Sequence, residues 1–253
     1  MRLGETLAKA RLASVRLAEY PCEVPVDLDA AYAEQEAMAD AMALPRVGWK
    51  VGVTSAAARE MLGLEEPFCG PMYAPYVMPS PAEFSVDAND LRIVEAEIGF
   101  RMKSDLAPRA ADFMANEVAA AIATVHPVFE LANKRLPGTA KDDARWLIAD
   151  GAMNQAFTYG DGVAFDAAMD LASETVRVSV DGTFVTEGIG ANALGNPVDV
   201  VIWLANHLRV RGIPLRAGDW VSTGLICDVV FPDPGATVQA EFGSLGAVTL
   251  HLT

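Results

Sequence analysis

The chain has 253 residues, of which 52% are hydrophobic and 21% charged, so it holds enough apolar material for one large domain or two small ones. Its 34 acidic and 19 basic residues give a formal net charge of −15, which disfavours nucleic acids and anionic membranes and suits metal cations. Three scattered cysteines, Cys22, Cys69 and Cys227, are too few for a disulfide framework and indicate reduced thiols in a cytoplasmic protein.

The first part of the chain is predicted to be helical. Apolar residues recur at helical spacing over 6–17 and again over 27–44, and Pro45 ends the second helix. We therefore expect residues 1–45 to form an N-terminal helical extension. Charges run through this segment, which is not typical of a signal peptide, and no stretch reaches the roughly 18 consecutive apolar residues of a membrane span.

The next ninety residues predict strands, helices and one long loop. In order, the pattern predicts a strand over 46–54, a helix over 55–64, an irregular proline-rich loop over 65–84, a strand over 92–100 and a helix over 108–126. Ser55 is the expected N-cap of the first of these helices and Gly63 its stop. The proline-rich loop is long enough to be functional.

The last part of the chain is predicted to be rich in strands. Residues 144–160 predict a strand and a turn, and 174–188 predict two strands around Asp181 and Gly182, a two-residue hairpin signal. A helix is expected over 196–212, with more strands over 218–224 and 237–253. Helices at the front and strands later indicate an α+β fold with a largely antiparallel or mixed sheet. We expect one β-rich catalytic domain over 46–253.

Two carboxylates interrupt the apolar strand "RIVEAEIGF". Successive strand residues point to opposite faces, so Glu95 and Glu97 project from the same face. A solvent-facing side of the strand explains this as well as a site does. A third acid, Glu130, lies among apolar residues in "HPVFELANK". Three carboxylates without clustered His or Cys describe a site for Mg²⁺ or Mn²⁺.

Lys50 is the candidate base of such a site. It lies in the apolar strand "GWKVG", where a lysine is ordinarily an edge or surface residue. If it points inward, burial would lower its pKa and suit it to proton transfer. Its charge would also bring three glutamates and one divalent cation to neutrality before an anionic substrate enters.

An ordered set of motifs resembles the fumarylacetoacetate hydrolase superfamily, nearest to its 2-keto-4-pentenoate hydratase and 4-oxalocrotonate decarboxylase branch. The motifs cover nearly the whole chain and are specific as a set: "VGWKVGVTSAAAREMLGLEEPFCGPMY", "IVEAEIGFRMKSDL", "VHPVFEL", "IADGAMNQAFTYG", "GNPVDVVIWLANHL" and "AGDWVSTG". The resemblance implies a mixed β-roll or sandwich core with the N-terminal helices as an extension.

The resemblance also assigns site residues. It implies Mg²⁺ or Mn²⁺ held by Glu95, Glu97 and Glu130. It further implies a catalytic Lys50 that moves protons with help from Asp150. The "TG" pair that follows the "GDWVS" strand is Thr223 and Gly224, and the resemblance places both near the substrate carboxylate.

Hydratases of this branch read like "QPDFGTLF" where this chain reads "EPFCGPMY", so Phe68 stands in place of an aspartate that handles water. "TGALG" likewise becomes "TGLIC".

The resemblance predicts a metal-dependent lyase of the 2-keto-4-pentenoate hydratase type. The substrate would be a small 2-oxo or 2-hydroxy-dienoic acid from aromatic catabolism, and the reaction would pass through a metal-stabilised enolate. A 4-oxalocrotonate-type decarboxylase is the main alternative, because both reactions share that enolate. A C–C bond hydrolase ranks lower, since no histidine precedes His126. A non-catalytic keto-acid binding protein is the last alternative. The family also implies a homo-oligomer.

Overall fold

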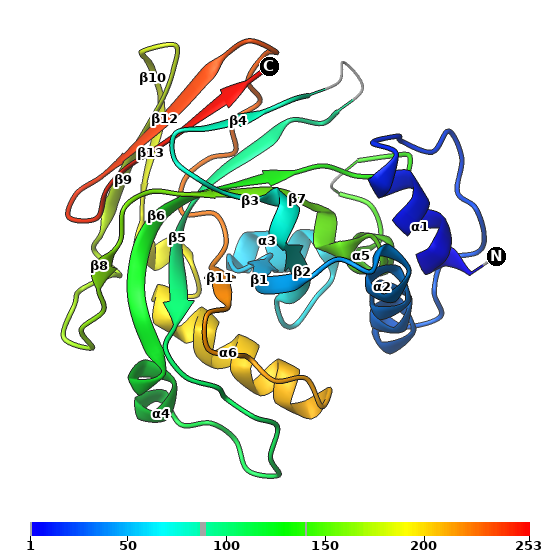
Figure 1. Ribbon diagram of the computed structural model, residues 1–253, viewed down its shortest axis with the longest axis horizontal. Helices are drawn as coiled ribbons and strands as arrows, with labels where there is room; N and C mark the ends of the chain where they lie inside the picture. Colours follow the sequence, from blue (N-terminus) through cyan, green and yellow to red (C-terminus); the bar gives the residue numbers. More distant parts are fainter. Residues whose placement is uncertain (1, 87–89, 140) are drawn as a thin grey trace.

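The computed structural model describes residues 2–86, 90–139 and 141–253, and it has two β-sheets flanked by helices (Figure 1). The larger sheet has eight strands in the order β2-β1-β11-β5-β6-β7-β3, with β8 paired to β6. Its strands are β1 (Arg46–Gly52), β2 (Phe68–Tyr73), β3 (Val77–Pro79), β5 (Ile93–Met102), β6 (Ile122–Ala132), β7 (Asn154–Tyr159), β8 (Val163–Ala164) and β11 (Trp220–Ser222).

The smaller sheet has five strands in the order β10-β9-β12-β13-β4. They are β4 (Ala82–Phe84), β9 (Thr175–Val180), β10 (Thr183–Ile189), β12 (Thr237–Phe242) and β13 (Gly246–Leu252). The hairpin predicted around Asp181 and Gly182 is confirmed, and both turn residues have the positive φ that this two-residue turn requires. Both sheets mix parallel and antiparallel pairs, which confirms the mixed-sheet α+β prediction.

Six α-helices are described: α1 (Leu3–Leu12), α2 (Leu28–Met42), α3 (Ala56–Leu62), α4 (Ala115–Ala120), α5 (Ala144–Ala149) and α6 (Pro197–Val210). In Figure 1, α1 and α2 lie together at one side of the molecule, ahead of β1 in the chain, as expected of an N-terminal helical extension. The caps of α3 are confirmed, since Ser55 accepts a hydrogen bond from Ala58 N and Gly63 ends the helix with φ +64°. None of the described helices is long and apolar enough to cross a membrane.

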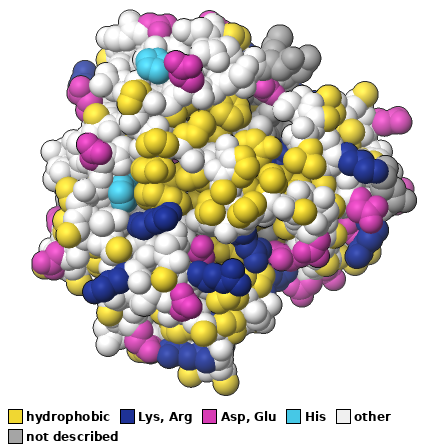
Figure 2. Space-filling view, viewed as in Figure 1, with side chains coloured by type: hydrophobic (Ala, Val, Ile, Leu, Met, Phe, Trp, Pro, Cys, Tyr) yellow, Lys and Arg dark blue, Asp and Glu magenta, His cyan; other side chains and the backbone are white. Residues whose placement is uncertain are grey.

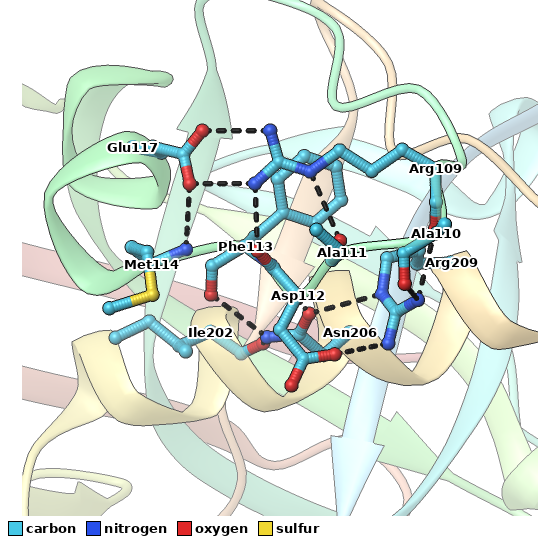
Figure 3. Close-up of polar contacts among 10 residues, drawn as sticks. All are labelled: Arg109, Ala110, Ala111, Asp112, Phe113, Met114, Glu117, Ile202, Asn206 and Arg209. Atoms are coloured by element: carbon cyan, nitrogen blue, oxygen red, sulfur yellow. Dashed lines mark hydrogen bonds and ion pairs between the residues drawn. The ribbon is translucent and has the colours of Figure 1, made fainter.

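The predicted helix over 108–126 is wrong, because only Ala115–Ala120 is helical and Ile122–Ala132 is a long strand. The strand wins because it pairs with β5 along its whole length, which sequence periodicity does not reveal. The loop before α4 is instead fixed onto α6 (Figure 3). Phe113 N donates to Asn206 Oδ1 at 2.8 Å, and Asn206 Nδ2 donates back to Phe113 O at 3.1 Å.

Two other stretches are more regular than predicted. The expected loop over 65–84 contains β2, β3 and β4, and its prolines are tolerated because β2 and β3 are the edge strands of the larger sheet. The expected strand and turn over 144–160 begins with α5, which Asp143 caps, before the turn and β7 follow. Such a short helix leaves no readable period in the sequence.

The faces of β5 separate the core from the site. Val94, Ile98 and Phe100 point to the main apolar cluster, which also contains the buried face of α6. Glu95 and Glu97 point to the opposite face. This alternation is the one that the sequence predicts, and it sets the carboxylates on one side of a strand whose other side is core.

Candidate active site

The register of four adjacent strands brings the predicted acids and lysine together. Glu95 on β5 lies directly opposite Glu130 on β6. On the other side of β5, Ser222 of β11 pairs with Gly99, and Lys50 of β1 pairs with Ser222. Because residues paired across a sheet point to the same face, all of these side chains project from one face of the larger sheet.

The three glutamates form a compact group of oxygen donors. Each offers one carboxylate oxygen, and these oxygens lie within 4.8 Å of one another. Glu97 and Glu130 are fully buried, and Glu95 is half-buried. Glu97 Oε1 has no hydrogen-bond partner among the described residues, although it is buried. Like charges this close repel, so the cluster and its orphaned oxygen fit a hard divalent cation.

The pKa values of the acids reflect this crowding. Burial, followed by repulsion from Glu130 and Glu95, raises the pKa of Glu97 well above its ordinary value. Burial also raises the pKa of Glu95 to about 7, with Lys50 opposing the rise. A cation bound among them would reverse these directions by favouring the ionised carboxylates.

Neighbouring groups hold two of the acids in place through one oxygen each. Glu97 Oε2 accepts hydrogen bonds from Ser222 Oγ and from Gly224 N, the latter at 2.8 Å. Glu130 Oε1 accepts from Asn154 Nδ2 at 3.0 Å. Sequence reasoning missed Ser222 and Asn154 in these roles, because their contacts depend on strand register. The one available signal was the polar Ser222 in an otherwise apolar strand.

Lys50 points inward and is 5% exposed. Its Nζ forms an ion pair with Glu130 Oε2 at 3.1 Å. Burial by itself lowers the pKa of Lys50, but the charges of Glu130, Glu95 and Glu97 outweigh burial, and the net shift is upward. The expected lowering of this pKa is therefore wrong for the protein without a metal, because three carboxylates surround the ammonium group.

A cavity of about 550 Å³ opens above this group. Lys50 and Glu95 line it together with a wall that is mostly apolar. The apolar part comprises Val53, Ala58, Met61, Leu62, Phe68, Ile93, Ala132, Leu147, Ala152, Met153, Leu225, Val229 and Phe231. Lys141 is the other cationic residue among the described residues of the lining. Glu95, Glu187 and Asp228 line the same cavity, so its two cationic residues lie among acidic ones.

The remaining predicted residues fall into two groups. Phe68 and Gly224 line the cavity, and Gly224 has φ +88° with no room for a Cβ beside Thr54. Thr223 does not line the cavity, and its hydroxyl donates to Ile98 O at 2.7 Å. The structure thus keeps Gly224 close to the acids and turns the Thr223 side chain into the sheet.

Asp150 is fully buried behind the cavity wall and does not line the cavity. Its two carboxylate oxygens accept from Arg135 Nε and Arg135 N, both at 2.7 Å. Burial raises the pKa of Asp150, and Arg135 opposes that rise. The structure therefore pairs Asp150 with Arg135 and does not bring it into the cavity beside Lys50.

Comparison with known protein families identifies the family of the chain. The family model of the fumarylacetoacetate hydrolase C-terminal domain matches residues 72–253. The chain belongs to this family. The family match begins after Lys50 and Phe68.

Relatives whose names state an activity indicate the type of reaction. A 2-keto-4-pentenoate hydratase of Burkholderia vietnamiensis is 30% identical over 82% of this chain and 78% of its own length. A 4-oxalocrotonate decarboxylase of Pseudomonas sp. is 31% identical over 80% of this chain and 76% of its own. These similarities support a lyase activity of the hydratase or decarboxylase type.

Solved structures share the fold over the whole chain. A 4-oxalocrotonate decarboxylase from Pseudomonas putida G7, complexed with magnesium and adipate, has a TM-score of 0.87 and 28% sequence identity. The match covers 99% of this chain and 96% of that one. The same enzyme complexed with calcium and acetate has a TM-score of 0.84. The larger sheet, the smaller sheet and the N-terminal helices are therefore a shared architecture.

Proposed function

We propose that this protein is a divalent-cation-dependent hydratase that acts on a small 2-hydroxy-2,4-dienoic acid or its 2-oxo tautomer. One observation carries the proposal: Glu95, Glu97 and Glu130 converge beside Lys50 at the wall of a mostly apolar cavity. The relatives named hydratases, among them a 2-hydroxyhexa-2,4-dienoate hydratase of Comamonas testosteroni, support the same reaction class.

Mg²⁺ is the cation that best fits an all-oxygen donor set of three carboxylates, and Mn²⁺ suits the same ligands. When bound, such a cation supplies Lewis-acid polarisation and orients the 1-carboxylate and 2-oxygen of the substrate.

Lys50 is the residue that we assign to proton transfer. Its ammonium group lies 3.1 Å from Glu130 Oε2 and lines the cavity, where the conjugated carbon chain would lie. A proton given and taken by Nζ along this chain allows water to add at the remote carbon. Asp150 contributes indirectly in this proposal, because its carboxylate is held by Arg135 and not directed at the substrate.

Phe68 and its apolar neighbours favour a substrate whose far end carries no charge. Most residues of the cavity lining are apolar, among them Leu62, Leu225 and Phe231, and Glu187 and Asp228 line it too. An apolar wall stabilises an alkyl or alkenyl end and penalises an unpaired carboxylate. We assign Gly224 and Thr223 to the neighbourhood of the substrate carboxylate, and the hydrogen bond from Gly224 N to Glu97 Oε2 supports this for Gly224.

Decarboxylation of a dicarboxylic keto acid is the second candidate, and Lys141 is the observation that favours it. Its cationic side chain lines the cavity and would pair with a distal carboxylate. In that reaction the bond to the distal carboxylate breaks and CO₂ leaves. A C–C bond hydrolase and a non-catalytic binder rank lower: no histidine is present among the described lining residues, and Lys50 with its three acids is intact.

The test uses purified protein with Mg²⁺, with Mn²⁺ and after chelation. 2-Hydroxypenta-2,4-dienoate and 4-oxalocrotonate are supplied separately, and ultraviolet absorbance and CO₂ release are followed. Metal-dependent loss of dienoate absorbance without CO₂ supports hydration, and CO₂ from 4-oxalocrotonate supports decarboxylation. Metal binding with no turnover of either compound would contradict both proposals and favour the binder.

We also propose that the protein is a cytoplasmic homo-oligomer. All three cysteines are free thiols, which supports a reducing compartment. Figure 2 shows hydrophobic side chains gathered over β3, β6 and β7 on one face, and exposed apolar patches of this kind mark association surfaces. Light scattering at several concentrations measures the oligomeric state, and a monomer throughout would contradict this proposal.

A further inference from the structure

A fully buried arginine from the N-terminal helices reaches the strand that supports the metal site. Arg11 lies in the last turn of α1 and is 2% exposed. Its guanidinium group donates from Nη1 to Asn154 O and from Nη2 to Gln155 O at 3.2 Å. Tyr73 and Tyr76 cover the group, with ring centroids 5.2 Å and 5.0 Å from Arg11 Cζ.

The two carbonyls that Arg11 binds flank an irregularity in the sheet. Leu131 of β6 pairs with Ala156 of β7, but the next residue of β6, Ala132, pairs with Asn154, so Gln155 is an extra residue on β7. A β-bulge of this kind disrupts the ladder and re-aims the side chains beside it. Buried carbonyls left without a partner are costly, and here Arg11 supplies the missing donors.

Arg135 holds the same bulge from the other side. Its Nη1 donates to Asn154 O at 3.2 Å and to Gln155 Oε1 at 3.0 Å. Its remaining donors bind Asp150, as described above, including the Asp150 carbonyl. Asn154 O therefore accepts from two guanidinium groups, and the position of Asn154 is fixed by both.

Asn154 connects this cationic cluster to the acids. While its carbonyl accepts from Arg11 and Arg135, its side chain donates to Glu130 Oε1 at 3.0 Å. Glu130 is thereby left with Oε2 directed at Lys50. One residue on β7 thus joins α1 to a predicted metal ligand, through contacts that are all buried.

The turn before the bulge forms part of the cavity wall. Gly151, Ala152 and Met153 all have positive φ, which is strained for the two non-glycine residues. Ala152 and Met153 line the cavity. The surrounding contacts that fix residues 150–155 therefore control both this wall and the direction of the Asn154 side chain.

Attachment of α1 to the core does not require a charged side chain at position 11. An apolar side chain would attach α1 to the core without the cost of burying a guanidinium group beside a second one. Burial and the charge of Arg135 lower the pKa of Arg11 to about 10. The carboxylate of Asp150 opposes this lowering, so the cation is held here by the carbonyls of the bulge and by that charge.

We propose that Arg11 is a positioning residue of the active site: through Asn154 it orients Glu130 for cation binding, so α1 is a functional part of the site. The inference rests on the proposed function, because it takes Glu130 as a metal ligand. Groups that hydrogen-bond to metal ligands typically change metal affinity 10- to 100-fold when removed.

The experiment measures the Mn²⁺ dissociation constant by electron paramagnetic resonance, and that of Mg²⁺ by calorimetry, at a temperature where circular dichroism shows each variant to be folded. Arg11→Met is expected to raise the dissociation constant about tenfold or more. Arg11→Lys keeps the charge but reaches one carbonyl at most, so an intermediate value is expected, and this variant serves if Arg11→Met does not fold.

Arg16→Met is the matched control. Arg16 also binds backbone carbonyls, those of Leu136 and Gly138, but it does not contact Asn154. Its removal is expected to leave metal affinity within about twofold of wild type, because its contacts lie outside the bulge.

A double-mutant cycle with Asn154→Ala separates positioning from general loosening. If Arg11 acts through Asn154, the double variant Arg11→Met/Asn154→Ala binds Mn²⁺ about as well as the weaker single variant. Wild-type Mn²⁺ affinity in Arg11→Met, or in Arg11→Lys if that variant has to replace it, would overturn the inference. So would a double variant whose loss of affinity equals the product of the two single losses. An equal loss of affinity in Arg16→Met would overturn it as well. A wild-type protein that binds neither cation would instead overturn the proposed function, so the two failures are distinguishable.

Discussion

Replacement of Glu97 by glutamine is expected to change the stability of the protein in opposite directions with and without a cation. The amide keeps the size of the side chain and an oxygen that accepts from Gly224 N and Ser222 Oγ, and it removes one negative charge from the cluster. Without metal, this relieves repulsion among the three clustered acids. With metal, it removes an anionic ligand.

The structure gives the size of both effects. The ligand oxygens lie within 4.8 Å of one another, and two unit charges at that separation interact by about 3 kcal/mol at an effective dielectric constant near 20. Because the pKa of Glu97 is already raised, the metal-free glutamine variant should be as stable as wild type or more stable. Loss of one carboxylate from the cation is expected to weaken Mg²⁺ binding by about 100-fold or more.

Urea unfolding with and without MgCl₂ measures both quantities. At a Mg²⁺ concentration about 100 times the wild-type dissociation constant, wild type gains about 2.7 kcal/mol, and Glu97→Gln should gain less than about 0.5 kcal/mol. Glu174→Gln is the control, because Glu174 is also buried but accepts from Ser244 N and Ser244 Oγ outside the site. It should lose stability and keep the full Mg²⁺ gain. A wild-type Mg²⁺ gain in Glu97→Gln would refute the ligand assignment.

Three further outcomes are expected. Lys50→Met should lower kcat by about 10²- to 10⁴-fold while Mg²⁺ affinity, measured by calorimetry, stays equal or tightens, and undiminished turnover would remove Lys50 from the mechanism. Burial and Arg211 lower the pKa of His207 from 6.5 to about 4, so the stability it confers is complete above pH 6.5 and declines as the pH falls toward 4. Between pH 7.5 and 5.0 the free energy of unfolding in urea should fall by up to about 2 kcal/mol more in wild type than in His207→Gln, the full figure being reduced by solvent screening of this half-buried ring; equal pH dependence would argue against a neutral imidazole in the folded state. Asn206→Ala should cost about 1–2 kcal/mol and speed proteolysis of residues 109–114 without changing Mg²⁺ affinity, since it frees the loop from α6; unchanged proteolysis would contradict this role.

Local chemistry explains the parts of the fold that the sequence predicts. The hairpin at Asp181 and Gly182, the caps of α3 and the amphipathic α6 each depend on residues within one element, so their signals are complete in the sequence. The same holds for the shared face of Glu95 and Glu97, which follows from the two-residue period of a strand. The helix predicted over 108–126 failed because pairing with β5 outweighs local helix propensity.

The sequence by itself therefore determined which residue types are available for chemistry: three carboxylates, a candidate base in Lys50, and no thiolate or histidine cluster. Only the tertiary structure decided how they meet. Strand register sets Glu130 opposite Glu95, and the bulge on β7 turns Asn154 toward Glu130. The tertiary structure also pairs Asp150 with Arg135 and brings Arg11 from α1 to the bulge. Register and long-range hydrogen bonds join residues more than a hundred positions apart, such as Arg11 with Asn154 and Ser222 with Glu97, and no local sequence pattern encodes such contacts.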